Sequence, residues 1–215
     1  MLVVGFPSGT FAANCYLVAR EPGAECVIID PGQDAAPKVT EALAEHRLTP
    51  VAVLATHGHF DHVADAAEFG VPVHLRPEDR GLLADPWSGA SPQLVAALGD
   101  AVHPVEPAEL IDLTDGELNL AGLAITVAHT PGHTPGSAIF RLGELVFTGD
   151  TLFAGSIGRT DLPGGSVALL EQSLADRLLT LDDRTVVLPG HGGTSTIGGE
   201  RRANPFLSAL RVTHG

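Results

Sequence analysis

The sequence predicts an α+β fold in which two β-sheets pack together and helices cover their outer sides. Short apolar, strand-like runs alternate with glycine-rich turns along all 215 residues. These runs form two similar β-rich halves, and each half is followed by a segment whose apolar residues have helical spacing. Helices layered on packed sheets are one of the few stable ways to bury such apolar faces. The length predicts a single domain over residues 1–215, with a short C-terminal helical tail at about 199–215.

The N-terminal half is expected to contain five strands, at 1–6, 13–19, 26–32, 50–56 and 71–75. The third strand ends at Pro31-Gly32, a pair that is typical of a turn. A helix is expected at 34–47, where Asp34 is the expected N-cap and the apolar residues have helical spacing. A second helix is expected at 61–70 and ends at Gly70.

The C-terminal half repeats this pattern after an irregular segment. Residues 84–108 are rich in proline and small residues, which predicts an irregular lid or connection. Strands are expected within 116–132, 136–150 and 185–193, together with a helix at 166–181.

The charge balance argues against a nucleic-acid partner. The chain contains 26 acidic and 12 basic residues, which gives a formal net charge of −14. It therefore lacks the basic surface with which nucleic-acid-binding proteins neutralise phosphates. We expect the partner to be a small molecule instead.

Cysteine usage and hydropathy indicate a cytoplasmic protein. The two cysteines, Cys15 and Cys26, lie in apolar stretches and are expected to be buried, reduced thiols. No window approaches the roughly 18 apolar residues of a membrane span. The first residues also lack the basic and apolar regions of a signal peptide. We therefore expect no membrane partner.

The segment "THGHFDH", residues 56–62, is typical of a metal site. It follows an apolar strand and places three histidines and one aspartate within seven residues. His57 and His59 are two residues apart, so on an extended loop they point to the same side and can chelate one ion. Asp61 and His62 follow one step later and point elsewhere, as ligands of a second ion would. One tetrahedral zinc ion cannot accept all four groups together with further ligands and water.

Three further ligands are expected where other strands end in tight turns. His133 lies between two Pro-Gly turns, Asp150 follows the strand "ELVF" and Gly149, and His191 follows the strand "VVLP" and Gly190. The seven residues divide into two sets. His57, His59 and His133 are expected to bind a first metal ion, Asp61, His62 and His191 a second, and Asp150 to bridge the two ions.

The segments "THGHFDH", "HTPGHTPGS", "FTGDTLF" and "LPGHG", in this order, resemble the metallo-β-lactamase superfamily. The resemblance covers nearly the whole chain. It implies a four-layer αββα sandwich with a dinuclear metal site at one edge of the two sheets. It also implies that Asp30, in "IIDPG", supports a ligand histidine by a hydrogen bond that fixes the tautomer of the imidazole.

Two further segments resemble the glyoxalase II branch of this superfamily, the hydroxyacylglutathione hydrolases, in a short bacterial form. They are "GSIGRTDLPGG" at 155–165 and "ERRANPFL" at 200–207. Longer members of the branch have an additional C-terminal helical region that helps to bind glutathione. Only the start of that region, around 204–206, is present in this sequence, so the thiol carrier stays open.

The resemblance implies a metal-dependent hydrolase that cleaves an acyl-thioester into a carboxylic acid and a thiol. Two metal ions roughly 3.5–4 Å apart would hold a water molecule and lower its pKa from about 15.7 to about 7, which gives hydroxide at neutral pH. Asp61 and Asp150 are the expected catalytic residues: Asp61 accepts a hydrogen bond from the attacking water, and Asp150 is the shared ligand. Zinc is the expected metal, and the same ligands also suit iron and manganese.

Arginines near the metal ligands are candidates for substrate binding. Arg159 and Arg201 are expected to bind a substrate carboxylate, because a guanidinium group matches the geometry of a carboxylate. The alternative for Arg159 is a structural salt bridge with Asp161. The alternative for Arg201 and Arg202 is a solvated helix surface.

Three other functions remain open from the sequence. A persulfide dioxygenase of the same fold would use a single iron ion bound by His57, His133 and Asp150. A lactone or ester hydrolase would use the same hydroxide on a different bond. A non-catalytic metal-binding protein would not require ligands that bridge two ions.

Overall fold

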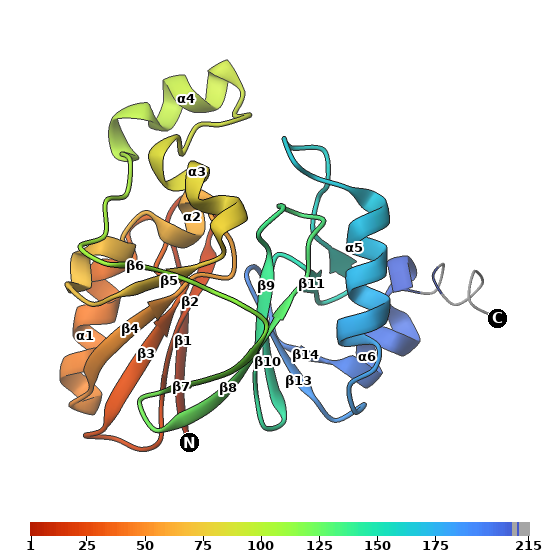
Figure 1. The fold of residues 1–215 in the computed structure, drawn as a ribbon, viewed down its shortest axis with the longest axis horizontal. Helices are drawn as coiled ribbons and strands as arrows, with labels where there is room; N and C mark the ends of the chain where they lie inside the picture. Colours follow the sequence, from red (N-terminus) through yellow and green to blue (C-terminus); the bar gives the residue numbers. More distant parts are fainter. Residues whose placement is uncertain (208–209, 211–215) are drawn as a thin grey trace.

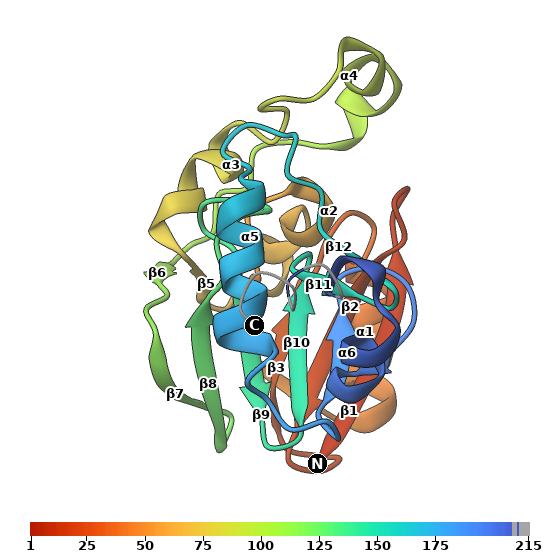
Figure 2. The same cartoon turned by 90° about the vertical axis from the view of Figure 1, so that its right-hand side faces the viewer.

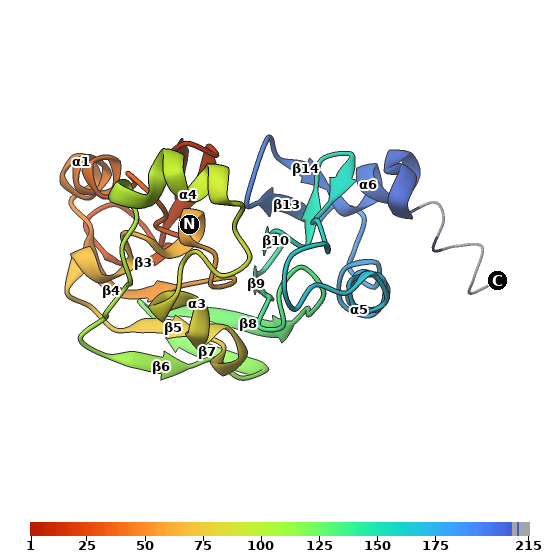
Figure 3. The same ribbon diagram turned by 90° about the horizontal axis from the view of Figure 1, so that it is seen from above.

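Two six-stranded sheets form the centre of the computed structural model, which describes residues 1–207 and 210. One sheet has the order β1-β2-β3-β4-β5-β6 and the other the order β14-β13-β10-β9-β8-β7. Helix α1 covers the outer side of the first sheet, and helices α5 and α6 cover the outer side of the second (Figure 1). The view from above shows the two sheets lying side by side between these helices (Figure 3). This arrangement confirms the predicted αββα sandwich.

The first sheet is built from the N-terminal half. Its strands are β1 (Leu2–Ser8), β2 (Ala13–Ala19), β3 (Glu25–Ile29), β4 (Thr49–Leu54), β5 (Val73–Leu75) and β6 (Leu110–Asp112). The first three pair antiparallel, whereas β3, β4, β5 and β6 pair parallel, with helix α1 (Ala36–His46) as the crossover from β3 to β4. Every residue of β2 is buried, as expected for a strand covered on both faces.

The second sheet is built from the C-terminal half. Its strands are β7 (Gly116–Leu120), β8 (Leu123–His129), β9 (Ala138–Leu142), β10 (Leu145–Gly149), β13 (Val186–Pro189) and β14 (Ser195–Thr196). Strands β10 and β13 are parallel and are connected through α5 (Val167–Ser173) and the π-helix η4 (Leu174–Leu178). A small hairpin of β11 (Leu152–Phe153) and β12 (Ser156–Ile157) follows β10, and α6 (Ile197–Ala203) follows β14.

The alternation of side chains along β2 divides the apolar core into layers. Cys15 and Leu17 face the layer beneath α1, whereas Tyr16 and Val18 face the layer between the two sheets. In that inner layer, the rings of Tyr16 and Phe147 meet edge to face with centroids 5.2 Å apart. A third layer lies beneath α5 and η4. The sheets are therefore held together by apolar packing on both sides, which fixes the position of the loops at their ends.

Two predictions about helices in the N-terminal half are wrong. The expected helix at 61–70 is two short helices, α2 (Phe60–Val63) and η1 (Ala66–Phe69), because the Asp65 backbone N–H donates to Pro31 O instead of continuing the helix. Asp34 is not the N-cap of α1. Its φ is +58°, and the Asp65 carboxylate accepts the hydrogen bond of Ala36 N from another segment at 2.7 Å.

The segment expected to be irregular contains regular structure. It includes α4 (Pro92–Leu98), whose N-cap Ser91 accepts a hydrogen bond from Leu94 N, and the turn η3 (Gly99–Ala101). The preceding η2 (Pro77–Asp79) and α3 (Arg80–Ala84) lead into it. Figure 2 shows α4 on an arm that extends away from the two sheets. In the expected C-terminal tail, residues 208–209 and 211–215 lie outside the described residues.

None of the helices within the described residues is long and apolar enough to cross a membrane.

The two cysteines are expected to be unreactive in the folded protein. Both thiols are fully buried and free, and burial raises the pKa of Cys26 to about 11 and that of Cys15 well above its ordinary value. Because only the thiolate reacts, a thiol reagent at about pH 8 should modify neither residue until the chain unfolds. Counting modified thiols before and after denaturation tests this. Rapid modification of the folded protein would contradict the burial.

Candidate metal centre

The seven predicted ligands lie together at one end of the sandwich. His57 and His59 follow β4, Asp61 and His62 lie in α2, and His133 lies in the loop between β8 and β9. Asp150 follows β10, and His191 follows β13. Because the parallel strands of each sheet end at the same edge, residues distant in sequence meet there.

The first group of donors consists of His57, His59 and His133. Their ligand nitrogens all lie within 4.8 Å of one another. His59 Nδ1 is 2.9 Å from His133 Nε2, so two imidazole nitrogens point at the same place. Nitrogen donors that converge in this way could hold one metal ion.

The second group consists of Asp61, His62 and His191, again within 4.8 Å of one another. His62 Nε2 is 3.3 Å from His191 Nε2, which is itself 3.4 Å from Asp61 Oδ2. This group offers two nitrogen donors and one oxygen donor.

Asp150 lies between the two groups. Its Oδ1 is 3.4 Å from His62 Nε2, and its Oδ2 is 3.5 Å from His133 Nε2 and 3.6 Å from His191 Nε2. His57, His62 and Asp150 also lie within 4.8 Å of one another, so the two groups adjoin. The single carboxylate of Asp150 therefore faces donors of both groups, as a bridging ligand does.

The unpaired atoms of the site fit metal ions. His57 Nε2 and Asp150 Oδ1 are buried without a hydrogen-bond partner among the described residues. Such an unsatisfied polar atom costs about 1–3 kcal/mol, and a cation bound between the two groups would remove that cost. Nitrogen and oxygen donors suit zinc, iron and manganese.

The histidines of the site differ in their affinity for protons. Burial, together with the neighbouring His133, lowers the pKa of His59 to about 3, and burial also lowers the pKa of His57 well below its ordinary value. Both are thus neutral imidazoles at neutral pH, the form that binds a metal. Burial by itself lowers the pKa of His62, but the surrounding carboxylates outweigh it and raise that pKa to about 10. The second group therefore favours a positive charge at its centre.

Hydrogen bonds on the far side of the imidazoles fix their orientation. His62 Nδ1 donates to Asp30 Oδ2 at 3.0 Å. Asp30 also accepts hydrogen bonds from Thr56 N at 2.7 Å and Thr56 Oγ1 at 2.6 Å. The Thr56 hydroxyl, having donated its hydrogen to Asp30, accepts one from His57 Nδ1 at 3.1 Å. Asp30 thus holds one ligand directly and another through Thr56, which leaves the Nε2 atom of each ring directed into the site.

Backbone carbonyl groups fix the orientation of two other imidazoles. His133 Nδ1 donates to Arg159 O at 2.8 Å, and His191 Nδ1 donates to Phe11 O at 3.1 Å. His59 differs, because it presents Nδ1 to the site. Gly190 is required for close packing, since a Cβ there would overlap the Asp150 carboxylate.

Asp79 is a supporting residue that the sequence did not reveal. It is 1% exposed, and its Oδ2 accepts hydrogen bonds from Gly58 N at 2.9 Å and Thr134 Oγ1 at 2.6 Å. Its Oδ1 accepts one from Gly136 N at 2.7 Å. Asp79 thereby joins the loop of His57 and His59 to the loop of His133. In the sequence it resembles an ordinary acidic residue after a strand, and nothing distinguishes it.

Five of the seven donors line the floor of a pocket of about 600 Å³: His59, Asp61, His133, Asp150 and His191. Six large apolar side chains line its walls, together with the smaller Pro86 and Ala90: Phe11, Phe60, Leu94, Phe153, Ile157 and Leu162. Leu94 comes from the α4 arm, and Ile157 and Leu162 come from the segment after β10, so the wall is made by loops of both halves.

The two predicted substrate-binding arginines have different positions. Arg159 lines the pocket and donates two hydrogen bonds to the Asp161 carboxylate. Arg201 is not among the residues that line the pocket, and its expected contact with substrate stays a prediction. Its guanidinium donates to Asp183 and to the carbonyl oxygens of Leu179 at 2.8 Å and Leu181 at 2.9 Å, so it holds α6 against the segment that follows η4.

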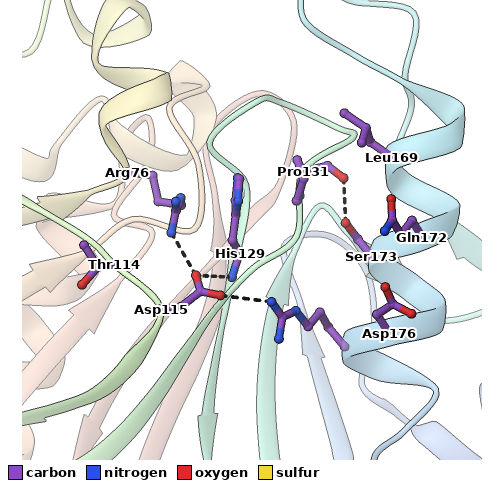
Figure 4. Close-up of a pocket in the computed structure, with 10 residues that line it drawn as sticks. Arg76, Thr114, Asp115, His129, Pro131, Leu169, Gln172, Ser173 and Asp176 are labelled. Carbon is purple, nitrogen blue, oxygen red and sulfur yellow. Dashed lines mark hydrogen bonds and ion pairs between the residues drawn. The ribbon is translucent and has the colours of Figure 1, made fainter.

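A second cavity, of about 440 Å³, lies between the end of β8 and α5 (Figure 4). At its base the Asp115 carboxylate accepts hydrogen bonds from Arg76, Arg177 and the His129 backbone N–H. His129 Nε2 donates to Pro135 O at 2.8 Å. The charged groups at the base pair with one another and connect the two halves of the chain.

Comparison with known proteins agrees with this geometry. The family model described as metallo-beta-lactamase superfamily matches residues 8–191. An uncharacterized protein of Mycobacterium tuberculosis is 48% identical, over 98% of this chain and 99% of its own. The probable metallo-hydrolase YqgX of Bacillus subtilis is 38% identical, over 96% and 97%. The hydroxyacylglutathione hydrolase GloC of Haemophilus influenzae is 36% identical, over 94% and 96%.

Solved structures give the same result. The BLEG-1 B3 metallo-beta-lactamase has a TM-score of 0.86 at 36% identity and covers 96% of this chain and 100% of its own. TTHA1623 in a di-iron-bound form has a TM-score of 0.81 at 40% identity, over 95% and 100%. ETHE1 from Myxococcus xanthus has a TM-score of 0.77 at 27% identity, over 100% and 92%.

Replacing Asp79 by alanine should weaken metal binding. The change leaves two backbone N–H groups and one hydroxyl without their acceptor and releases the two ligand loops from each other. Loss of such a supporting partner typically lowers metal affinity about 10–100-fold. Competition with a chromogenic chelator measures the metal affinity. The affinity of Asp79→Asn should lie between those of the wild-type protein and Asp79→Ala. Asp112→Ala is the matched control, since Asp112 pairs with Arg80 at the surface. A folded Asp79→Ala protein with unchanged affinity would contradict the assignment.

Proposed function

The chain belongs to the metallo-β-lactamase superfamily, and we propose that it is a dinuclear metal-dependent hydrolase that cleaves acyl-thioesters. The observation that carries the proposal is the Asp150 carboxylate, which faces two complete groups of donors. The similarity to hydroxyacylglutathione hydrolase GloC supports a thioester as the substrate class. The reduced, buried cysteines and the net charge of −14 support a cytoplasmic enzyme that does not act on nucleic acid.

The residues of the site have distinct roles in this reaction. Two divalent ions held by the seven ligands would supply a water of lowered pKa and a Lewis acid for the carbonyl group. Asp61, which lines the pocket, accepts a hydrogen bond from the attacking water and orients it. Zinc is the metal that we propose, and iron is compatible with the same donors.

The bond changes need no nucleophile from the protein. The water oxygen bonds to the thioester carbonyl carbon, the C–S bond breaks, and its electron pair leaves with the sulfur. One proton of the water ends on the thiol. Neither cysteine lines the pocket. Two serines do, Ser88 and Ser91, and the Ser91 hydroxyl accepts the N-cap hydrogen bond of α4. A thiolate is a good leaving group, so a separate general acid is not required.

The mononuclear alternative uses fewer of the converging residues. A persulfide dioxygenase with one iron ion would need His57, His133 and Asp150. It would leave the other four converging residues without a metal to bind: His59, Asp61, His62 and His191. The convergence of the second group within 4.8 Å therefore favours hydrolysis. A lactone hydrolase would share the same floor and differ in the pocket wall.

The purified protein should contain close to two metal ions per chain, because each group of donors is complete. Removal of the ions with a chelator should abolish hydrolysis of a lactoyl thioester, and added zinc should restore it. Elemental analysis and thiol release are the two measurements. Activity that survives complete metal removal would contradict the mechanism, and oxygen consumption with a persulfide at one iron per chain would favour the dioxygenase.

Asp150→Ala should remove the shared ligand. We expect the metal content to fall to about one ion per chain. Turnover should decrease about a thousandfold, which corresponds to about 4 kcal/mol in the activation barrier. Asp112→Ala again provides a control for loss of an aspartate. An Asp150→Ala protein that retains two ions and full turnover would show that Asp150 does not bridge.

A further inference from the structure

We infer that the pocket above the metal centre selects thioesters whose thiol carrier is apolar and has no net negative charge, and that Asp161 enforces this preference by neutralising Arg159. The inference rests on the proposed thioester hydrolysis and adds the class of thiol carrier. It is argued from the pocket wall, which is separate from the metal donors.

The wall offers apolar surface to the part of the substrate that does not react. Phe11, Phe60 and Leu94 approach from the N-terminal half, and Phe153, Ile157 and Leu162 from the C-terminal half. Past Ile157 and Arg159, which line both spaces, lies a third cavity, of about 570 Å³, whose lining is largely apolar. Its lining includes Val167 and Leu170 of α5. An apolar carrier would therefore gain buried contact area along this surface.

Arg159 is the only arginine or lysine among the described residues that line the pocket. Its Nε donates to Asp161 Oδ1 at 2.8 Å and its second terminal nitrogen to Asp161 Oδ2 at 2.7 Å. This two-point pairing occupies one edge of the guanidinium, and a substrate carboxylate would have to compete with Asp161 for its charge. The pair contributes no net charge to the pocket.

The other arginines near the ends of the sheets are engaged elsewhere. Arg76 and Arg177 pair with Asp115 in the second cavity, and Arg201 pairs with Asp183. The remaining charged side chains of the pocket, Asp61 and Asp150, belong to the metal centre. A carrier with two carboxylates, such as glutathione, would thus lose solvation without gaining an uncommitted cationic partner.

The Arg159–Asp161 pair can be changed without disturbing the fold. The two side chains are 61% and 68% exposed, and pairs this exposed contribute little to stability. Asp161→Asn removes the negative charge and leaves Arg159 available. Arg159→Gln removes the positive charge and leaves Asp161 in place. The two variants should shift substrate preference in opposite directions.

The test compares thioesters that share one lactoyl group. S-lactoyl-N-acetylcysteamine and S-lactoyl-N-hexanoylcysteamine have neutral carriers, the second more apolar, whereas S-lactoylglutathione has an anionic carrier. The metal-loaded wild-type protein should hydrolyse the hexanoyl compound with a kcat/KM about tenfold or more above that of the glutathione compound. The acetyl compound should fall between them, since it has less apolar surface.

The variants are judged by the ratio of kcat/KM for the glutathione and hexanoyl compounds. Asp161→Asn should raise this ratio about tenfold, and Arg159→Gln should lower it. Asp182→Asn is the matched control, because it removes the same charge from a surface pair with Arg184 and should leave the ratio unchanged. If Asp161→Asn does not fold, the ratio measured for Arg159→Gln still tests the inference, because it should decrease.

Two kinds of failure are distinguishable. A wild-type preference for the glutathione compound, or a ratio that Asp161→Asn and Arg159→Gln leave unmoved, would overturn the inference while thioester hydrolysis stands. Failure of the metal-loaded protein to hydrolyse all three compounds would overturn the proposed function and the inference with it.

Discussion

The structure depends on bringing seven metal donors from separate segments to one buried point. Imidazole nitrogens and carboxylate oxygens held this close lose their water, and those without a partner destabilise the fold. Hydrogen bonds on the far side orient four of the donors: His57, His62, His133 and His191. Asp30 does this for His62, and through Thr56 for His57, from within the first sheet. Asp79 does it for the loops, by joining the segment of His57 to the segment of His133.

The sandwich makes this convergence possible because the donors follow buried strands whose pairing register is fixed. Strands β3 and β4 pair parallel in one sheet, and β10 and β13 pair parallel in the other, so their carboxyl ends meet at one edge. Tyr16 packs against Phe147 between the sheets. Its hydroxyl also donates to Pro189 O, two residues before His191, at 2.8 Å. The apolar layer thus sets the distance between the two halves of the metal site as well as the stability of the fold.

The sequence predicted which histidines and aspartates converge, because few roles other than metal binding require these residues immediately after several strands. It predicted less where the decisive contact comes from another segment. Asp79 is recognisable only once Gly58 and Gly136 are brought beside it. The start of α1 and the break after α2 both depend on Asp65, whose partners Pro31 and Ala36 precede it by about thirty residues. Arg201 was expected in the pocket, and its pairing with Asp183 could not be foreseen from spacing.

Reaction class and substrate choice are carried by different elements that meet at one residue. The donors sit at the ends of strands, whereas the pocket wall comes from the α4 arm and the segment after β10. Arg159 belongs to both, since its carbonyl oxygen holds His133 while its guanidinium is paired with Asp161. A substitution at position 159 changes only the side chain. The backbone carbonyl that accepts the hydrogen bond of His133 is present whichever residue stands there. The charge of the pocket can therefore vary while the position of His133 is retained, which allows one metal centre to serve different thiol carriers.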